Sequence, residues 1–134
     1  MRLPAALAPA CALLLAGCQG ILGIQDCPAI PTPAVQVEVY DARTGRPAAG
    51  GARGWVRSAT RQDSLRVVGW TGPQISDSTA YLMSDVHGRP GNYTVQVTRP
   101  GYQAWQVDGV RVRKTECGVR TAKLRAELVP EAGR

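Results

Sequence analysis

Residues 91–102 constrain the fold of this chain more than any other stretch. They read Gly-Asn-Tyr-Thr-Val-Gln-Val-Thr-Arg-Pro-Gly-Tyr, and Tyr93, Val95 and Val97 alternate with polar side chains. Alternation with a period of two is typical of a β-strand that turns one face to a core and the other to water. A glycine before the run and a Pro-Gly pair after it mark turns at both ends. The stretch therefore predicts a central, half-buried strand.

Short alternating segments fill most of the chain after residue 34, and Gly/Pro-rich turns separate them. We expect further strands at residues 35–41, 52–58, 65–70, 79–83, 102–107, 110–112 and 121–128. No helical period of useful length appears beyond the first 17 residues. The chain of 134 residues is 44% hydrophobic and 19% charged, as expected of one globular domain. These features predict an all-β fold, an antiparallel β-sandwich of about seven strands.

Residues 1–17 have the composition of an export signal. Met1-Arg2 gives a positive start, and the run from Leu3 to Ala16 consists mainly of Leu and Ala. This run is shorter than the roughly 20 apolar residues that cross a bilayer. We therefore expect a helical signal peptide at residues 1–17 that is removed after export.

The signal peptide ends in a recognisable motif. Leu15-Ala16-Gly17-Cys18 resembles the lipobox of bacterial lipoprotein precursors. The resemblance implies a diacylglyceryl group on the Cys18 sulfur, cleavage before Cys18 and an acylated amine. Two or three acyl chains, at about 0.8 kcal/mol per buried methylene, anchor a protein firmly. Gln19 stands where Asp often signals inner-membrane retention, so we expect an outer-membrane lipoprotein if the cell is Gram-negative. The alternative is an ordinary secreted protein with Cys18 as an unpaired thiol.

Two cysteines remain after the leader and the lipidated position are set aside. Cys11 lies in the leader, which leaves Cys27 and Cys117 near the two ends of the mature chain. In an oxidising envelope these two are natural disulfide partners. A bridge across about 90 residues contributes at most about 4.6 kcal/mol in the loop-entropy model. Residues 18–33 then form the acylated cysteine and a Gly/Pro-rich flexible tether.

Three segments resemble a known family. They are Val37-Glu-Val-Tyr-Asp-Ala-Arg-Thr-Gly-Arg-Pro47, Gly91-Asn-Tyr-Thr-Val-Gln-Val97 and Gly101-Tyr102. Together they resemble the carboxypeptidase regulatory-like domain, which implies a transthyretin-like (prealbumin-type) β-sandwich over residues 34–130, with a tail at 131–134. The family has Thr-Asp-x-x-Gly before the central strand, and Ser84-Asp-Val-His-Gly88 only approximates it. Residues 57–78 match poorly.

Catalytic and metal chemistry find little support. His87 is the single histidine, in a segment that reads as a turn. A Ser-His-Asp site would need His87 to meet Ser84 and Asp85 in triad geometry, and no Gly-x-Ser-x-Gly elbow is present. Zinc sites need several His or Cys ligands. We therefore expect a non-enzyme without metal or cofactor. The alternative is a small envelope hydrolase or metal-dependent enzyme that uses His87 and nearby acids.

Calcium is a lesser alternative. Asp77, Asp85 and Asp108 are candidate ligands, but no Asp-x-Asp run concentrates them.

Binding is the function class that remains. Trp55, Trp70 and Trp105 offer flat faces for sugars or peptides, or belong to the core. Arg111, Arg113 and Arg125, with Lys114, Arg120 and Lys123, predict a basic stripe for anionic lipid or polysaccharide, or a solvated face. The net charge is +6, and loss of Arg2 leaves 15 basic against 10 acidic residues, or +5.

We interpret the chain as an envelope lipoprotein with a non-catalytic binding or structural module. The lipid on Cys18 would hold it to a membrane, and its partner would be another envelope protein or an anionic polysaccharide. The sequence gives no support for nucleic-acid binding, because no fingerprint of a nucleic-acid-binding module is present.

Overall fold

The computed structural model describes residues 27, 29, 32–67, 81–84 and 88–132. The expected signal peptide, Cys18, Trp70 and His87 lie outside these residues. Within them, no helix has the length and apolar character that crossing a membrane requires.

Eight strands make up the described part of the chain. They are β1 (Val35–Asp41), β2 (Arg53–Arg57), β3 (Gln62–Val67), β4 (Tyr81–Ser84), β5 (Gly91–Thr98), β6 (Trp105–Thr115), β7 (Gly118–Arg120) and β8 (Ala122–Leu128). The all-β sandwich that the alternating pattern predicts is confirmed, and β1 has the expected bounds.

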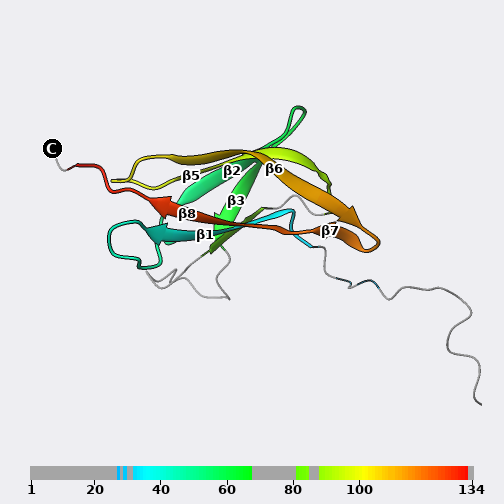
Figure 1. The fold of residues 1–134 in the computed structure, drawn as a ribbon, viewed down its shortest axis with the longest axis horizontal. Helices are drawn as coiled ribbons and strands as arrows, with labels where there is room; N and C mark the ends of the chain where they lie inside the picture. The colour runs from blue at the N-terminus through cyan, green and yellow to red at the C-terminus, as the bar shows by residue number, and fades with distance from the viewer. Residues whose placement is uncertain (1–26, 28, 30–31, 68–80, 85–87, 133–134) are drawn as a thin grey trace, which may run out of the picture.

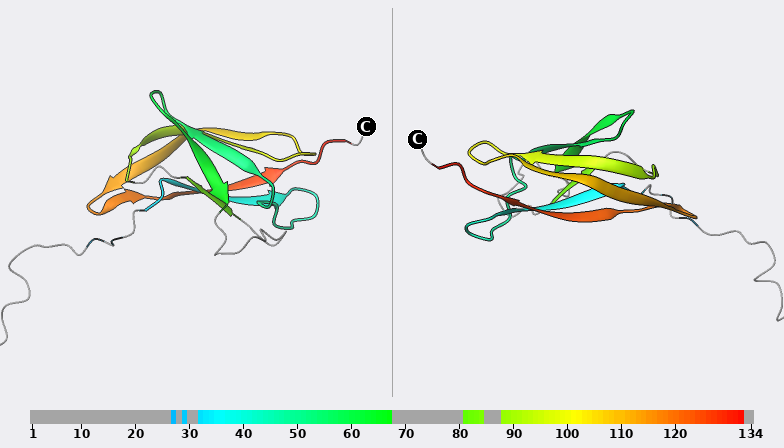
Figure 2. Two further views of the ribbon diagram at one scale, coloured as in Figure 1. Left: turned by 180° about the vertical axis from the view of Figure 1, so that it is seen from behind. Right: turned by 45° about the horizontal axis from the view of Figure 1, so that its top comes forward.

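The strands form two layers. Hydrogen bonds connect them in the order β7-β6-β5-β2-β3-β4-β1-β8. Strands β6, β5 and β2 form one layer, β1 and β8 lie beneath it, and β3 runs between the two (Figure 1). The turned views of Figure 2 show the same two layers. A single residue, Thr121, joins β7 to β8, so the two ends of the ladder are covalent neighbours.

Valine dominates the core between the layers. Val35, Val37 and Val39 of β1 are fully buried in one hydrophobic cluster, which also contains Val95 and Val97 of β5. The chain has no Phe, so β-branched side chains and leucines fill the volume that aromatic residues often take. Each buried Val or Leu side chain contributes about 1.5–3 kcal/mol relative to exposure, so this alternation is the main source of stability.

Four details differ from the expected arrangement. Strand β1 pairs in parallel with β8, from Val35 opposite Ala122 to Asp41 opposite Leu128, although an antiparallel sandwich was expected. The parallel pair arises because β8 returns from the same end of the molecule at which β1 begins. The short strand β7 was not predicted, because three residues are too few to show a period. The expected strand at 65–70 starts earlier, at Gln62, and its expected residues 68–70 lie outside the described part of the chain.

The fourth detail concerns the expected strands at 102–107 and 110–112, which are joined in the single strand β6 from Trp105 to Thr115. A β-bulge shifts the register of β5 and β6 between Tyr93 and Val95, and Gly109 adopts a positive φ of 70° there. The extra residue restores the inward direction of Val110 after the break in alternation at Asp108.

Candidate binding surfaces

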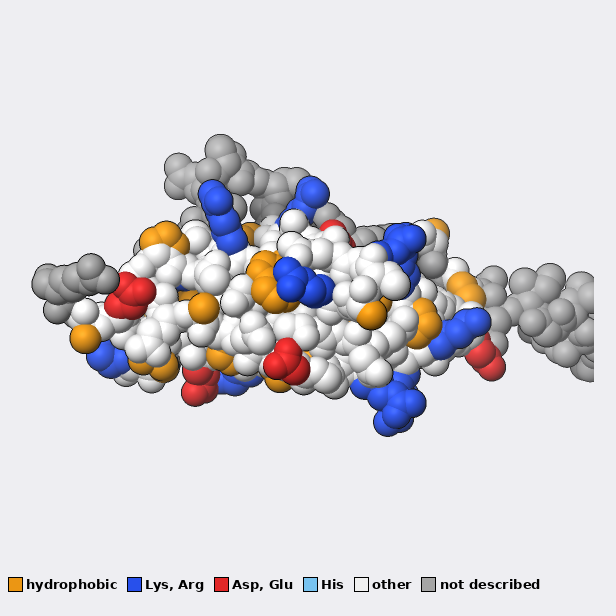
Figure 3. Space-filling model, turned by 90° about the horizontal axis from the view of Figure 1, so that it is seen from above, with side chains coloured by type: hydrophobic (Ala, Val, Ile, Leu, Met, Phe, Trp, Pro, Cys, Tyr) orange, Lys and Arg blue, Asp and Glu red, His pale blue; other side chains and the backbone are white. Residues whose placement is uncertain are grey.

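Trp55 lies on the outer face of the layer that contains β5 and β2. Its neighbour Val56 is buried, so Trp55 has the opposite direction and is half-buried, with no place in the hydrophobic core. It stands opposite Ser64 of β3 and Gln96 of β5. Seen from above, hydrophobic side chains appear as small separate groups among polar and basic surface (Figure 3). The Trp55 side chain is thus partly exposed on this face.

Arg57 completes this aromatic position. Its guanidinium carbon lies 4.7 Å from the centre of the Trp55 ring. Gln62 Oε1 accepts hydrogen bonds from Arg57 Nε at 3.1 Å and Nη2 at 2.8 Å. The amide therefore fixes the guanidinium over the indole. The pair forms a flat cationic and aromatic surface, which we call the Trp55 platform.

Polar side chains continue this outer face on β5 and β6. Thr94 donates its hydroxyl to Asp108 at 2.7 Å, and Gln106 donates its amide to the same carboxylate at 3.4 Å. Asp108 accepts both bonds beside the bulge. The described residues contain no group of three or more His, Cys, Asp or Glu that could hold a metal ion, and Asp77 and Asp85 lie outside them.

A second surface lies at the end of the sandwich where β5 and β8 begin and β6 ends. Two shallow hollows, of about 590 and 420 Å³, share Pro90, Gly91 and Asn92 as their common wall. Arg61 and Arg89 line the first hollow, and Arg111 lines the second. The cations here are Arg61, Arg89, Arg111, Arg113, Lys114 and Arg120, and we call this surface the basic end.

Tyr93 lies at the larger hollow. Its side chain is buried, and its hydroxyl donates to the Arg89 carbonyl at 3.0 Å. Burial raises the pKa of the Tyr93 phenol, and the positive charge of Arg61 partly opposes that rise. The hydrogen bond holds the segment before β5 in place, so the wall of the hollow is anchored to the core.

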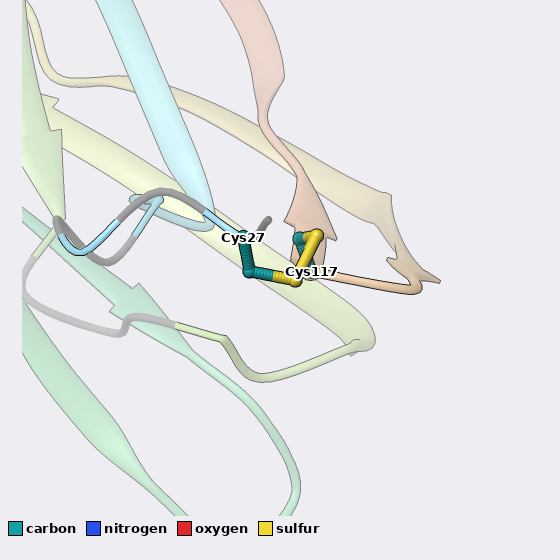
Figure 4. The surroundings of a disulfide bond; sticks show 2 residues. All are labelled: Cys27 and Cys117. Atoms are coloured by element: carbon teal, nitrogen blue, oxygen red, sulfur yellow. A yellow bond between two sulfur atoms is a disulfide. The ribbon is translucent and has the colours of Figure 1, made fainter. Parts of the chain in front are cut away.

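The predicted disulfide reaches this same end. Cys27 and Cys117 are bonded, with their Cα atoms 5.1 Å apart and a sequence separation of 90. Cys117 lies in the turn between β6 and β7, and Cys27 lies on the segment that leads to β1 (Figure 4). The bond fastens the start of the described chain to the turn beside Arg113 and Lys114.

Hydrogen bonds extend this attachment up to β1. The Thr121 hydroxyl donates to the Pro33 carbonyl at 2.7 Å, and the Gly88 amide donates to the Thr32 carbonyl at 3.3 Å. Residues 32 and 33, which were assigned to a flexible tether, are therefore held against the sandwich.

The remaining predicted residues have other surroundings. Trp105 is half-buried and packs against the core. Arg125 forms an ion pair with Glu127 at 3.0 Å and lies 4.2 Å from the centre of the Tyr40 ring. Arg125 also stands opposite Glu38 in the register of β1 and β8. Arg125 is thus surrounded by acids on the outer face of the other layer, whereas Arg111 and Arg113 belong to the basic end.

The sequence reasoning missed one polar cluster, at the opposite end. The Tyr102 hydroxyl donates to Asp41 Oδ2 at 2.7 Å, and the amides of Arg43 and Thr44 donate to Asp41 Oδ1 at 2.8 Å each. These bonds, led by that of Tyr102, lower the pKa of Asp41 to about 2, and the bond to Asp41 raises the pKa of Tyr102. We call this group the tyrosine corner. The polar groups of the tyrosine corner form hydrogen bonds with one another, which indicates a structural role.

The fold and these surfaces define a class: a small disulfide-linked β-sandwich whose candidate sites are open surfaces. No family model matches the chain, and no curated protein matches its sequence. Among solved structures, it is similar to a chain of a crystal structure from Acetivibrio cellulolyticus, a C-terminal interface mutant of a type II cohesin–X-dockerin complex. The identity is 16%, the match covers 74% of this chain and 57% of that chain, and the TM-score is 0.43. A likeness at this level carries no argument about function.

Proposed function

We propose that this chain is a lipid-anchored, non-catalytic binding module of a bacterial envelope, and that its Trp55 platform binds an anionic polysaccharide. The lipobox at Leu15-Ala16-Gly17-Cys18 supports the anchor. An envelope location is consistent with the Cys27–Cys117 disulfide, because such bonds persist in oxidising compartments. We place the module in the outer membrane if the cell is Gram-negative.

The outward position of Trp55 is the observation that carries the proposal. An indole ring offers an apolar face to the C–H groups of a sugar, and the neighbouring arginine offers parallel N–H donors to a carboxylate. Gln62 occupies Nε and Nη2 of Arg57, so the donors of Nη1 remain for a ligand among the described contacts. A polysaccharide that contains uronic acids supplies both an apolar ring face and a carboxylate.

The domain itself we propose to be carboxypeptidase regulatory-like. The resemblance rests on segments that contain Asp41 and Tyr102, and the structure joins these two side chains by a hydrogen bond of 2.7 Å. One hydrogen bond thus connects two separate segments of the motif. This supports the proposal that both segments belong to one carboxypeptidase regulatory-like domain.

Binding to polygalacturonate tests the function. The mature chain, solubilised in mild detergent, is measured against this polymer by affinity electrophoresis, with neutral dextran as the comparison polymer. We expect Trp55→Ala and Arg57→Gln each to weaken binding by about 3- to 30-fold, which corresponds to the loss of one exposed cation–π or charge-assisted contact.

Arg43→Gln is the matched control, because it removes the same charge from an exposed turn at the other end of the molecule. Equal retardation of the parent chain and both platform variants would contradict the proposal. Intact mass of the mature amino terminus tests the anchor separately: an unmodified Cys18 would overturn lipidation and leave polysaccharide binding unaffected.

A further inference from the structure

The cations of the basic end outnumber the described acidic groups near them. No ion pair joins any of its six cations to an acid within the described ranges. The described acids closest to them in sequence are Asp63 and Glu116. Six cations against two acids leave a strong local excess of positive charge, which attracts anions.

One pair of residues shows that this excess has a cost. Arg113 of β6 and Arg120 of β7 stand directly opposite each other in an antiparallel register. Both side chains are exposed, and like charges in directly opposed positions of a sheet destabilise it. An anion bound between the two opposed arginines would relieve their repulsion. It would also explain why so short a hairpin carries them.

The tether brings this surface close to the proposed anchor. Cys27 is bonded to the turn of the basic end, and Cys18 precedes Cys27 by nine residues. Nine extended residues span about 30 Å at most. Without the disulfide, the free segment between the lipid and β1 would be longer, although β1 begins at this same end of the sandwich. The disulfide therefore shortens the tether and keeps the basic end near the lipid.

We propose that the basic end docks on the anionic phospholipid headgroups of the membrane that holds the Cys18 lipid, and that the Cys27–Cys117 disulfide keeps it close to them. This inference rests on the proposed lipid anchor. Shallow hollows flanked by several cations suit a plane of many headgroups better than a single enclosed ligand. Each basic residue near such a surface strengthens membrane association about fivefold. The docked module would turn the tyrosine corner away from the lipid.

Arginine footprinting tests this orientation. The mature acylated chain is inserted into vesicles of phosphatidylcholine alone or of phosphatidylcholine with phosphatidylglycerol, and phenylglyoxal modification is followed by mass spectrometry. We expect modification of Arg111 and Arg113 to slow several-fold on the anionic vesicles. Arg43 and Arg46, exposed in the turn after β1, should react at the same rate on both. High salt should abolish the difference, because it shortens the range of charge interactions.

Paired variants separate docking from folding. In Arg111→Gln with Arg113→Gln, we expect the protection of Arg89 and Arg120 on anionic vesicles to fall several-fold. In Arg43→Gln with Arg46→Gln, which removes the same charge, that protection should remain. All changed side chains are exposed, so both variants should fold.

The possible failures are distinguishable. Equal rates on both vesicle types at Arg111 and Arg113, with the chain still bound, would overturn docking and leave the anchor intact. Slower modification of Arg43 and Arg46 instead would show the opposite orientation and overturn docking. A mature chain that does not remain with neutral vesicles would overturn the anchor and, with it, the docking that depends on it.

Discussion

The two ends of this sandwich differ in whether their polar and charged groups have partners within the described chain. At the tyrosine corner, Asp41 is buried and accepts hydrogen bonds from Tyr102, Arg43 and Thr44. At the basic end, exposed cations have no acidic partner among the described residues, and a disulfide supplies the constraint. The comparison teaches that one end is stabilised by its own polar bonds, whereas the other keeps its charges available.

Removing the disulfide should have the largest effect. Cys27→Ala with Cys117→Ala releases a 90-residue connection, and the loop-entropy model gives an upper limit of about 4.6 kcal/mol. Chemical unfolding of the parent with and without reductant, and of the double variant, measures the loss. The oxidised double variant should match the reduced parent. If reduction left the unfolding free energy of the parent unchanged, interactions other than the disulfide would have to hold the basic end in place.

A substitution at Gly54, between the two ends, gives a reference value for the stability changes expected at them. A Cβ atom at Gly54 would lie 2.6 Å from the Gln96 carbonyl oxygen and 2.7 Å from Leu65 Cδ1. The backbone oxygen belongs to the neighbouring strand and cannot move freely, so Gly54→Ala should cost about 1–3 kcal/mol. Urea unfolding tests this value, with Gly51→Ala as a comparison in an uncrowded turn of positive φ.

The contribution of the tyrosine corner to stability should be measurable at acidic pH. The pKa of Asp41 is lowered to about 2 from its ordinary 3.8, so its stabilisation is complete above pH 3.8 and is lost as the pH falls towards 2. Tyr102→Phe removes the largest cause of that shift. We expect the variant to have a higher Asp41 pKa and a weaker dependence of unfolding free energy on pH across this window.

Tyr40→Phe is the control for the tyrosine corner, since the Tyr40 ring contacts Arg125 and its hydroxyl makes no hydrogen bond within the described ranges. An Asp41 titration that is the same in Tyr102→Phe and in the parent, followed by NMR, would contradict the assignment. Above pH 10 the parent should also lose stability, because its bond to Asp41 raises the pKa of Tyr102.

The smallest effect on stability is expected at the basic end. Arg113→Gln removes one member of the opposed Arg113–Arg120 pair, so unfolding free energy should stay within about 0.5 kcal/mol of the parent and should rise rather than fall. Thermal unfolding at low and high salt checks it, because salt should reduce the gain. A large loss would show that Arg113 is structural and would remove the contrast between the ends.

Local patterns predicted much of the fold. The alternating valines predicted β1 and β5 because each strand buries one face completely. The disulfide followed from counting cysteines after the leader and the lipidation motif were set aside. The parallel pairing of β1 with β8 could not be predicted in this way, since register between segments far apart in sequence depends on the path of the whole chain.

The candidate sites were only partly predictable. The position of Trp55 in β2 could have indicated its outward direction, because its neighbour Val56 alternates with it and takes the core face. Arg113 and Arg125 both alternate with apolar residues, so the sequence could not show that one joins the basic end and the other pairs with Glu127. Asp41 and Tyr102 are 61 residues apart, and only the tertiary fold brings them together.

The parallel pairing of β1 has a consequence for the order in which the chain can be assembled. Strand β1 lies between β4 and β8, and residues 122–128 follow all the other strands of the described chain in sequence. Until they emerge, one edge of β1 has no partner, so the first strand of the domain is completed by the last. We expect the nascent sandwich to stay open until residues 122–128 have emerged.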